Sequence, residues 1–247
     1  MEKSTQIYGL RAVIEAIKAG KSIDKVYIQK GLKGELFKEF EALIRQQGIN
    51  TSQVPPAKLN RLTQNNHQGV VAQISPVRFH SLEKMVEEAL GNDKAPLFLL
   101  LDQLSDVRNF GAIIRTAECT GVHGIIVPKK GGAPVTADTI KTSAGAVFKM
   151  PIAKVDHIKD AIFYLQASGV RVIAATEKTK KNIYELAFDG PCAIVMGAED
   201  KGISASVLKI VDDAAKLPLL GDIESLNVSV ACAVVLYETV RQRSFQV

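Results

Sequence analysis

Short apolar runs alternate with helical segments through the C-terminal two thirds of the chain. The first run, residues 97–101, has no polar position and ends in Asp102. A strand that is apolar throughout is typical of a parallel sheet buried on both faces. The same alternation predicts strands at 124–128, 170–175 and 192–196, and helices at 111–120, 137–146 and 158–168. Strands that alternate with helices in this way predict an α/β fold with an open, mostly parallel sheet.

The end of the chain, residues 217–243, combines a loop with an unusually apolar helix. The apolar run 217–220 is typical of a strand end, and a polar loop follows it. Either Ser225 or Asn227 is suited to cap the next helix. This helix has almost no polar face, which predicts burial on most sides. A buried helix that begins in polar residues indicates a site at its positively charged end.

Residues 1–74 carry a second, smaller pattern. It predicts helices at 7–19, 36–47 and 57–62, strands at 25–29 and 69–74, and an irregular or extended segment at 51–56. These elements make a small α/β unit of the size of an independently folding domain. Its polar loop 65–69 either contacts RNA or is a plain turn, and its composition alone favours a turn.

Residues 75–95 separate the two patterns. Pro76 and a breaker at 91–96 flank a helix expected at 82–90. The predicted organisation is therefore a first domain at 1–74, a linker at 75–95 and a second domain at 96–247.

Composition narrows the class of protein. Hydrophobic residues make up 47% of the 247 residues and charged residues 23%, which is typical of a globular protein. No apolar run reaches the length of a membrane span, and the first 20 residues do not resemble a signal peptide. We therefore expect a soluble, cytoplasmic protein without a membrane partner.

The cysteines and histidines point to no metal site. Cys119, Cys192 and Cys232 are far apart in apolar segments, which favours three small buried residues over a disulfide or a metal. The four histidines lack the spacing of metal ligands.

The net charge of +5 lies entirely in the first domain. Residues 1–74 hold 11 Lys and Arg against 6 Asp and Glu, whereas the remaining residues hold 20 of each kind. Such segregation is typical of a surface that contacts a phosphate backbone.

Three loops follow predicted strands, at 102–115, 197–204 and 217–227. Ligands of open α/β sheets bind beyond the carboxyl ends of the strands, which is where such loops lie. In the first loop, Asn109 is suited to cap the helix, and Arg108 and Arg115 could face an anion near its start. The alternative is a capping Asn with a solvated Arg, and spacing alone does not separate the two.

The second loop, 197–204, is not a phosphate cradle. Ile203 stands where that motif needs a lysine, and Glu199 and Asp200 would repel a triphosphate. A dinucleotide fingerprint is missing too. The loop suits either a cationic or neutral ligand or an ordinary turn that uses the freedom of Gly197 and Gly202.

The three loops together resemble the motifs of a known family. Residues 109–117, 195–203 and 217–231 are similar, in this order, to the three motifs of the SpoU (TrmH-like) RNA ribose 2′-O-methyltransferases, and 142–146 fits the family's middle section. In the first domain, 8–13 and 67–72 resemble the RNA-binding domain, similar to ribosomal protein L30e, of members that methylate a guanosine of 23S rRNA.

The resemblance implies a chemistry that the pattern alone does not show. It implies S-adenosylmethionine as the cofactor, a deep trefoil knot in the second domain and a homodimer formed through the C-terminal helix. The catalytic positions it implies are Asn109, Arg115, Glu199, Ser225 and Asn227. The cofactor-binding positions are Thr176, Met196, Gly197, Leu217, Leu219 and Leu226. The RNA-binding positions are Arg11, His67, Gln68 and Arg108.

The expected function is methylation of a ribose 2′-hydroxyl in RNA. Two alternatives remain open at this point. A tRNA ribose 2′-O-methyltransferase would share every catalytic motif, and a non-catalytic RNA-binding relative would share the fold.

Overall fold

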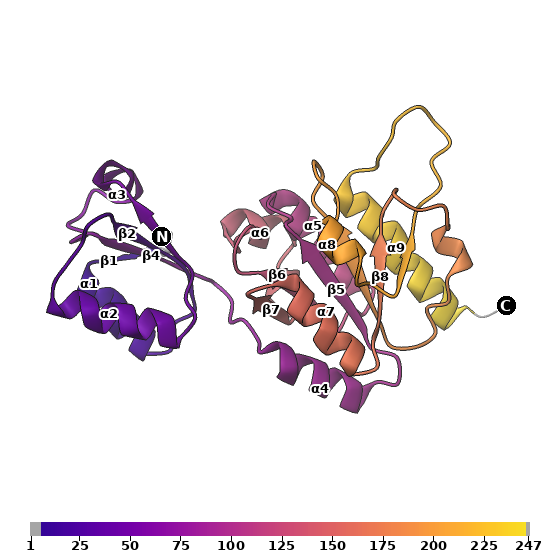
Figure 1. Ribbon diagram of the computed structural model, residues 1–247, viewed down its shortest axis with the longest axis horizontal. Coiled ribbons are helices and arrows are strands. Elements are labelled where there is room, and N and C mark those ends of the chain that lie inside the picture. The colour runs from indigo at the N-terminus through magenta and orange to yellow at the C-terminus, as the bar shows by residue number, and fades with distance from the viewer. Residues whose placement is uncertain (1–5, 246–247) are drawn as a thin grey trace. The chain divides into compact units, whose positions relative to one another are not determined.

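The computed structural model describes residues 6–245 and divides into two compact units between Arg78 and Phe79 (Figure 1). Within the described residues, no helix combines the length and apolar character that crossing a membrane requires.

The first unit is a four-stranded sheet with helices. Strand order is β1-β4-β2-β3, and only the β2–β3 pair is parallel. The strands are β1 (Gln6–Tyr8), β2 (Ile23–Gln29), β3 (Thr51–Val54) and β4 (Val70–Ile74), and the helices are α1 (Leu10–Lys18), α2 (Glu35–Gln46) and α3 (Pro56–Leu62). Apolar residues of α1 and α2 pack with those of β2 and β4 to form its core.

The predicted helix at 7–19 is wrong at its start. Ile7 and Tyr8 belong to β1, which pairs with β4, and α1 begins only at Leu10. Gly9 separates the two elements with a φ of 89°, a backbone angle that a helix does not contain. Periodicity missed this because pairing with β4 is a contact with a distant segment.

The second unit confirms the α/β class and the parallel sheet. Its order is β10-β8-β9-β5-β6-β7, and every pair is parallel. The strands are β5 (Leu97–Asp102), β6 (Gly124–Pro128), β7 (Ile152–Val155), β8 (Arg171–Ala175), β9 (Cys192–Gly197) and β10 (Asp213–Ala215). The helices are α4 (Leu82–Asn92), α5 (Val107–Cys119), α6 (Ala137–Thr142), α7 (Ile158–Ala167), α8 (Ala205–Leu208) and α9 (Val228–Ser244), with 3₁₀ turns η1 (Ala146–Phe148) and η2 (Ile183–Glu185).

Helices cover both faces of this sheet. From β5 the chain moves to β6 and β7, and after α7 it crosses to the other half of the sheet. Right-handed crossovers therefore place α5 and α6 on one face and α7 and α8 on the other. One core contains apolar residues of α4, α7 and α8 with strand residues such as Phe98 and Val195. On the opposite face α5 contacts α6 and α9.

Helix α4 lies within the segment that the sequence analysis assigned to a linker. Its residues Met85 and Val86 are buried in the core of the second unit, next to β6 and β7. The contacts thus place the change from one unit to the other just before α4.

Several other expectations are corrected by the structure. The predicted helix 137–146 ends at Thr142, because Ala144 and Gly145 have φ values of 50° and 83°. The strand end expected at 217–220 lies instead at β10, and 217–220 belongs to a loop.

Burial of the cysteines is confirmed for two of the three. Cys119 is exposed at the end of α5, because it lies on the outer face of that helix. Burial raises the pKa of the Cys192 thiol to about 11 and that of Cys232 to about 12, so neither is a reactive thiolate.

Helix α9 is not buried on most sides. Its inner face packs against α5 and β9, while Val230, Val234 and Tyr237 on the other face are 50%, 36% and 54% exposed. The apolar sequence therefore leaves an uncovered apolar face in the single chain.

Gly111 brings α5 and α6 together. A Cβ at this position would lie 1.8 Å from Oγ1 and 2.8 Å from Cβ of Thr142. We expect Gly111→Ala to lower the free energy of unfolding by about 2 kcal/mol, because the overpacking outweighs the gain in helix propensity. Urea unfolding in a Thr142→Ala background, which removes the nearest atom, should show a smaller cost. An equal cost in both backgrounds would contradict this packing.

Candidate functional site

The three predicted loops meet at one edge of the second sheet. β5 and β9 are neighbours, and the register pairs Asp102 with Gly197 at their carboxyl ends. The chain reverses its direction of winding between these strands, which is where open α/β sheets bind ligands. The loop after β10 reaches the same edge and leads into α9.

A cluster of three polar side chains joins the loops. Nδ2 of Asn109 donates to Oε1 of Glu199 at 2.7 Å, and Nδ2 of Asn227 donates to the same oxygen at 2.6 Å. Nδ2 of Asn227 also donates to Oδ1 of Asn109 at 3.1 Å. Glu199 and Asn227 follow Asn109 by 90 and 118 positions in the sequence, and the fold brings all three side chains together. The structure thus unites three of the five predicted catalytic positions in one contact network.

Asn227 also caps helix α9. Its Oδ1 accepts from the backbone N of Ser229 at 3.0 Å and of Val230 at 3.4 Å. The Ser229 hydroxyl donates to the same oxygen at 2.5 Å. Of the two caps considered, Asn227 is therefore the one used. Sequence reasoning gave Ser229 no role, although a serine two residues after a capping Asn was a usable signal.

The cap of α5 is Asp106 and not Asn109. Oδ1 of Asp106 accepts from the backbone N of Arg108 and of Asn109, both at 2.8 Å. The helix consequently begins at Val107, and Asn109 lies in its first turn. This correction matters for the site, because the Asn109 side chain is left to bind Glu199.

Arg115 is not part of the polar cluster. It follows Asn109 by six residues on α5, so the two side chains point about 120° apart around the helix. Arg115 and Arg108 are both exposed, and neither side chain has a hydrogen bond or ion pair to another described residue. Within one chain, Arg115 therefore does not meet Glu199.

The loop after β9 is anchored at both ends. The backbone N of Gly202 donates to the carbonyl O of Ala198 at 2.8 Å, and that of Ser204 donates to Oδ2 of Asp102 at 2.8 Å. Asp102 is buried, although the sequence analysis gave it no role. Its position as the one carboxylate at the end of an apolar strand was the available signal.

A cleft lies beside this loop. Its apolar part is lined by Thr176, Met196, Leu217, Leu219 and Leu226, and its more polar part by Gly197, Glu199 and the following loop residues. All six predicted cofactor-binding residues therefore line this cleft, whose two parts share Met196 and Leu226. Ser225, predicted as catalytic, lines both parts. Leu219 and Leu226 are partly exposed at the mouth.

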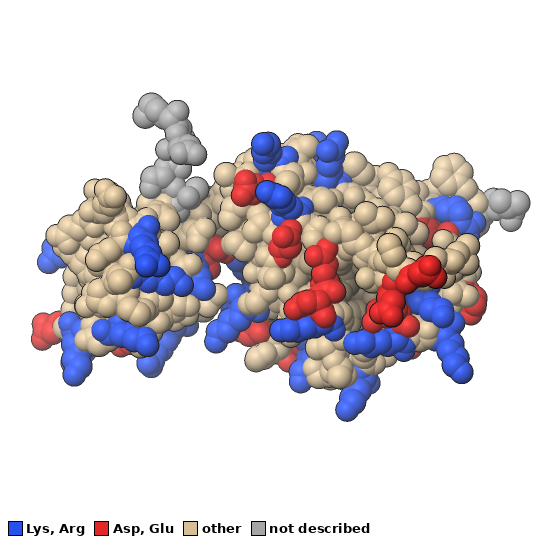
Figure 2. All heavy atoms as spheres, turned by 90° about the horizontal axis from the view of Figure 1, so that it is seen from above, with Lys and Arg blue, Asp and Glu red and all other residues tan. Residues whose placement is uncertain are grey.

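Acidic side chains outnumber basic ones in the polar part of the cleft, where the basic residues are Lys178 and Lys201. Glu177, Asp200 and Glu224 line it together with Glu199, and Figure 2 shows acidic side chains beside a hollow of the second unit. Glu177 and Glu224 were missed as candidates. Such a lining suits a ligand that carries positive charge.

The predicted RNA-binding residues of the first unit lie on its surface. Arg11 is exposed on α1. His67 is held by two hydrogen bonds: Nδ1 accepts from the Gly69 backbone N at 3.0 Å, and Nε2 contacts Oδ1 of Asn60 at 2.8 Å. This arrangement places the proton of the neutral ring on Nε2. Gln68 has a φ of 49° and is exposed in the turn.

Over residues 6–245, no three His, Cys, Asp or Glu side chains lie close enough together to hold a metal ion.

The polar cluster allows a direct test of Glu199. We expect Glu199→Ala to lower the free energy of unfolding by about 1 kcal/mol, because two amide donors lose their shared acceptor. Glu199→Gln keeps one oxygen acceptor and should cost about half as much. Asp200→Ala removes the same charge from the neighbouring exposed position and is the control in urea unfolding. Equal effects at 199 and 200 would show that the cluster contributes no stability.

Two family models match the chain. The SpoU rRNA Methylase family matches residues 96–237, and the family of RNA 2'-O ribose methyltransferase substrate binding domains matches residues 6–80. The first match lies within the second unit, and the second match covers mainly the first unit.

Relatives match over nearly the whole chain. The putative TrmH family tRNA/rRNA methyltransferase YacO of Bacillus subtilis is 33% identical, over 96% of each chain. A structure of AdoMet-bound rRNA methyltransferase from Sinorhizobium meliloti is 26% identical with a TM-score of 0.62, and the match covers 96% of this chain and 87% of that one.

A second solved structure matches a smaller share of the chain. The A. aeolicus TrmH/SpoU tRNA modifying enzyme is 28% identical with a TM-score of 0.55, and the match covers 65% of this chain and 81% of that chain. Together with the joined motif residues Asn109, Glu199 and Asn227, these matches show that the chain belongs to the SpoU family of RNA methyltransferases.

Proposed function

We propose that this protein transfers a methyl group from S-adenosylmethionine to a ribose 2′-hydroxyl of RNA, on a guanosine of 23S rRNA. The observation that carries the proposal is the polar cluster of Asn109, Glu199 and Asn227. It connects residues of all three motifs at the edge of a cleft that the predicted cofactor residues line.

The lining of the cleft fits S-adenosylmethionine. Leu217, Leu219 and Met196 offer an apolar surface for an adenine ring, and Glu177 and Glu224 place carboxylates near a cationic sulfonium or amine. The cofactor would supply an activated methyl group with a neutral leaving group. The chain therefore has to orient the ribose and assist the loss of one proton from a weakly acidic hydroxyl.

Arg115 is the residue we assign to the ribose. An arginine stays protonated at neutral pH and accepts no proton, so we propose that it positions the hydroxyl and a neighbouring phosphate, and that the hydroxyl proton leaves to water as the methyl–oxygen bond forms. The polar cluster holds the α5 and α9 starts in place around the cleft. We assign Ser225, which lines the cleft, to contact with the target nucleotide.

A homodimer would bring Arg115 to the cleft. Arg115 faces away from Asn109 in its own chain, and α9 presents Val230, Val234 and Tyr237 as an uncovered apolar face. We propose that a second copy covers this face and that its Arg115 completes the site. Sedimentation that shows an active monomer would overturn this arrangement.

The finer features of the fold belong to the same proposal. We propose that the segment from β10 through α9 passes through a loop as a deep trefoil knot, which would bring the 197–203 and 217–226 loops to one cleft. We also propose that the first unit is similar to ribosomal protein L30e and binds RNA.

Ribosomal RNA is favoured over tRNA by the extent of the matches. The S. meliloti rRNA methyltransferase matches both units, whereas the A. aeolicus tRNA enzyme matches 65% of the chain. The excess of positive charge lies in the first unit, which matches the substrate-binding family. RNA contacts by Arg11, His67 and Gln68 would use that charge.

Mapping of ribose methylation tests the substrate. Total RNA from cells without the protein should lack one 2′-O-methyl group, and we expect it in 23S rRNA. Loss of a tRNA methyl group instead would identify the tRNA alternative. Unchanged methylation, with no binding of S-adenosylmethionine by calorimetry, would identify a non-catalytic relative.

A further inference from the structure

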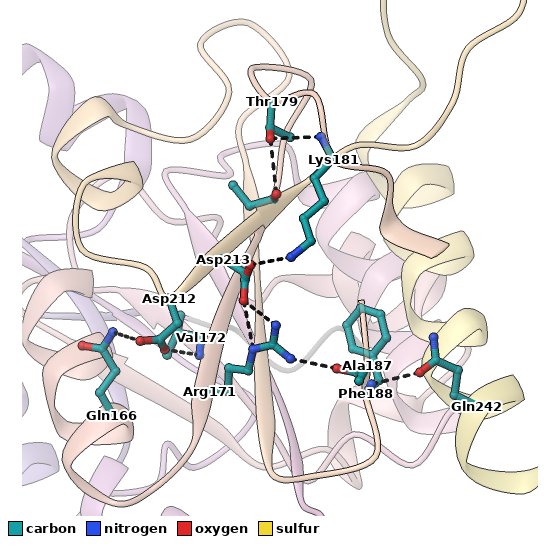
Figure 3. A network of polar contacts seen from close by, with 11 residues as sticks. Gln166, Arg171, Val172, Thr179, Lys181, Ala187, Phe188, Asp212, Asp213 and Gln242 are labelled. Atoms are coloured by element: carbon teal, nitrogen blue, oxygen red, sulfur yellow. Dashed lines mark hydrogen bonds and ion pairs between the residues drawn. The ribbon is translucent and has the colours of Figure 1, made fainter. Parts of the chain in front are cut away.

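Asp213, the first residue of β10, is shared by two cations from different segments (Figure 3). Nζ of Lys181 lies 2.9 Å from its Oδ1. Nε of Arg171 donates to its Oδ2 at 3.1 Å, and a second guanidinium nitrogen contacts the same oxygen. Arg171 also donates to the carbonyl O of Ala187 at 3.1 Å. One carboxylate therefore joins β8, β10 and the connection between β8 and β9.

Both joined segments continue directly into the cleft. Between β8 and Lys181 lie Thr176, Glu177 and Lys178, which form one wall. After β10 come Lys216, Leu217 and Leu219, which form a second wall. The Asp213 contacts thus lie at the base of two walls that would hold the same ligand.

Backbone pairing continues from Asp213 toward the cleft. The backbone N of Lys216 donates to the carbonyl O of Lys181 at 2.9 Å, and that of Ile183 donates to the carbonyl O of Lys216 at 2.8 Å. Thr179 adds a hydrogen bond from its hydroxyl to the carbonyl O of Ala214 at 3.4 Å. The segment around Lys181 is therefore laid along the outer edge of β10, which is otherwise the edge of the sheet.

Asp213 and its two cations are partly buried, so their electrostatic interaction is less screened by solvent than that of a fully exposed ion pair. The Asp213 side chain is 23% exposed, and Arg171 and Lys181 are 37% and 41% exposed. Arg171 first, and then Lys181, hold the pKa of the Asp213 carboxyl below its usual range. A carboxylate with several charge-assisted hydrogen bonds holds its partners more firmly than an isolated surface pair.

We infer that Lys181 and Asp213 are positioning residues for the cofactor: through their ion pair they set the distance between the 176–178 wall and the 216–219 wall. Neither side chain lines the cleft, so they act through these walls and not by contact. The inference rests on the proposed binding of S-adenosylmethionine. Loss of the pair should weaken cofactor binding and leave the rate at saturating cofactor unchanged.

Lys181→Met tests this inference in the full-length protein. We expect the dissociation constant of S-adenosylmethionine, measured by calorimetry, and the KM for it each to rise about fivefold. The kcat at saturating cofactor should stay within about twofold of wild type. Lys181→Arg, which keeps a cation within reach of Asp213, should restore both constants.

Lys18→Met is the matched control. Lys18 pairs with Glu39 at 2.8 Å and is similarly exposed, but it lies in the first unit. The control should leave the dissociation constant unchanged. Asp213→Asn provides a second variant and should weaken cofactor binding at least as much as Lys181→Met.

The outcomes separate this inference from the proposed function. Wild-type protein that does not bind S-adenosylmethionine would overturn the proposed function itself. Wild-type binding combined with an unchanged dissociation constant in folded Lys181→Met and Asp213→Asn would overturn only the positioning role. A lower melting temperature with unchanged cofactor affinity would show a purely structural ion pair and would likewise overturn it.

Discussion

Replacement of Gly197 by alanine is expected to abolish cofactor binding and to destabilise the second unit by at least about 3 kcal/mol. Gly197 is the last residue of β9 and lines the cleft. A Cβ there would lie 2.2 Å from the carbonyl C of Gly202 and 2.3 Å from the backbone N of Ile203. These neighbours are backbone atoms, so no side-chain rotation relieves the overlap.

Displacement of the 198–203 loop by the added Cβ explains why cofactor binding and stability should fall together. The hydrogen bonds from Gly202 to Ala198 and from Ser204 to Asp102 hold the loop against the ends of β5 and β9. A shift of the backbone at 202–203 breaks this geometry and moves Glu199 away from Asn109 and Asn227. The overlap thus reaches the polar cluster as well as the cleft.

Gly190→Ala is the control for this substitution. Gly190 lies in the same unit, has no positive φ, and a Cβ there would meet no atom within 4 Å. Its unfolding free energy should stay within about 0.5 kcal/mol of wild type. Urea unfolding and calorimetry with S-adenosylmethionine measure both effects. Wild-type stability and affinity in Gly197→Ala would show that the 198–203 loop adapts freely.

The edge of the sheet that carries the site could be predicted because it depends only on the strands being parallel. Apolar runs ending at Asp102 and near Gly197 marked two buried strands, and parallel strands end at the same edge. The pairing of these strands was not visible in the sequence, since β5 and β9 are far apart along the chain. The motifs supplied that information through the resemblance to a family.

Individual polar contacts were harder to predict than the elements. Asp106 and Asn109 are both good helix caps, and only the backbone at Val107 decides that Asp106 is the cap. Asp213 is a charged residue in a three-residue strand at the sheet edge, so neither periodicity nor motif marked it or its partner Lys181. Such contacts join distant segments, and local patterns do not contain them.

The apolar character of α9 shows a different limit of prediction from the sequence. Its composition predicted burial on most sides, and the single chain buries one face only. Sequence patterns report how much apolar surface an element has, but they do not distinguish cover by the same chain from cover by a second copy. The same ambiguity applies to Arg115, whose partners are absent from its own chain within residues 6–245.

Replacement of Arg115 by alanine is expected to lower kcat by about 10² to 10³-fold while the dissociation constant of S-adenosylmethionine stays unchanged. Arg115 is exposed on α5 and does not line the cleft of its own chain, so neither folding nor cofactor binding depends on it. Arg115→Lys keeps the charge but not the planar fork of donors, and should restore only part of the rate. Near wild-type methyl transfer by Arg115→Ala would remove Arg115 from the mechanism.

Arg108→Ala provides the contrast on the same helix. Arg108 is also exposed, and we propose that it contacts an RNA phosphate. Its loss should raise the KM for RNA and make that constant less sensitive to added salt, while kcat stays close to that of wild type. Equal loss of kcat in both variants would point to a general effect on RNA binding.

A mixture of two inactive variants tests whether Arg115 acts in the partner subunit. Arg115→Ala lacks the arginine, and Glu199→Ala lacks the centre of the polar cluster. If each site combines Arg115 of one copy with Glu199 of the other, every mixed dimer holds one intact site. Unfolding and refolding of an equal mixture should then restore about a quarter of the wild-type activity, because about half of the dimers are mixed. If both residues act within one chain, a mixed dimer has no intact site and the mixture stays inactive.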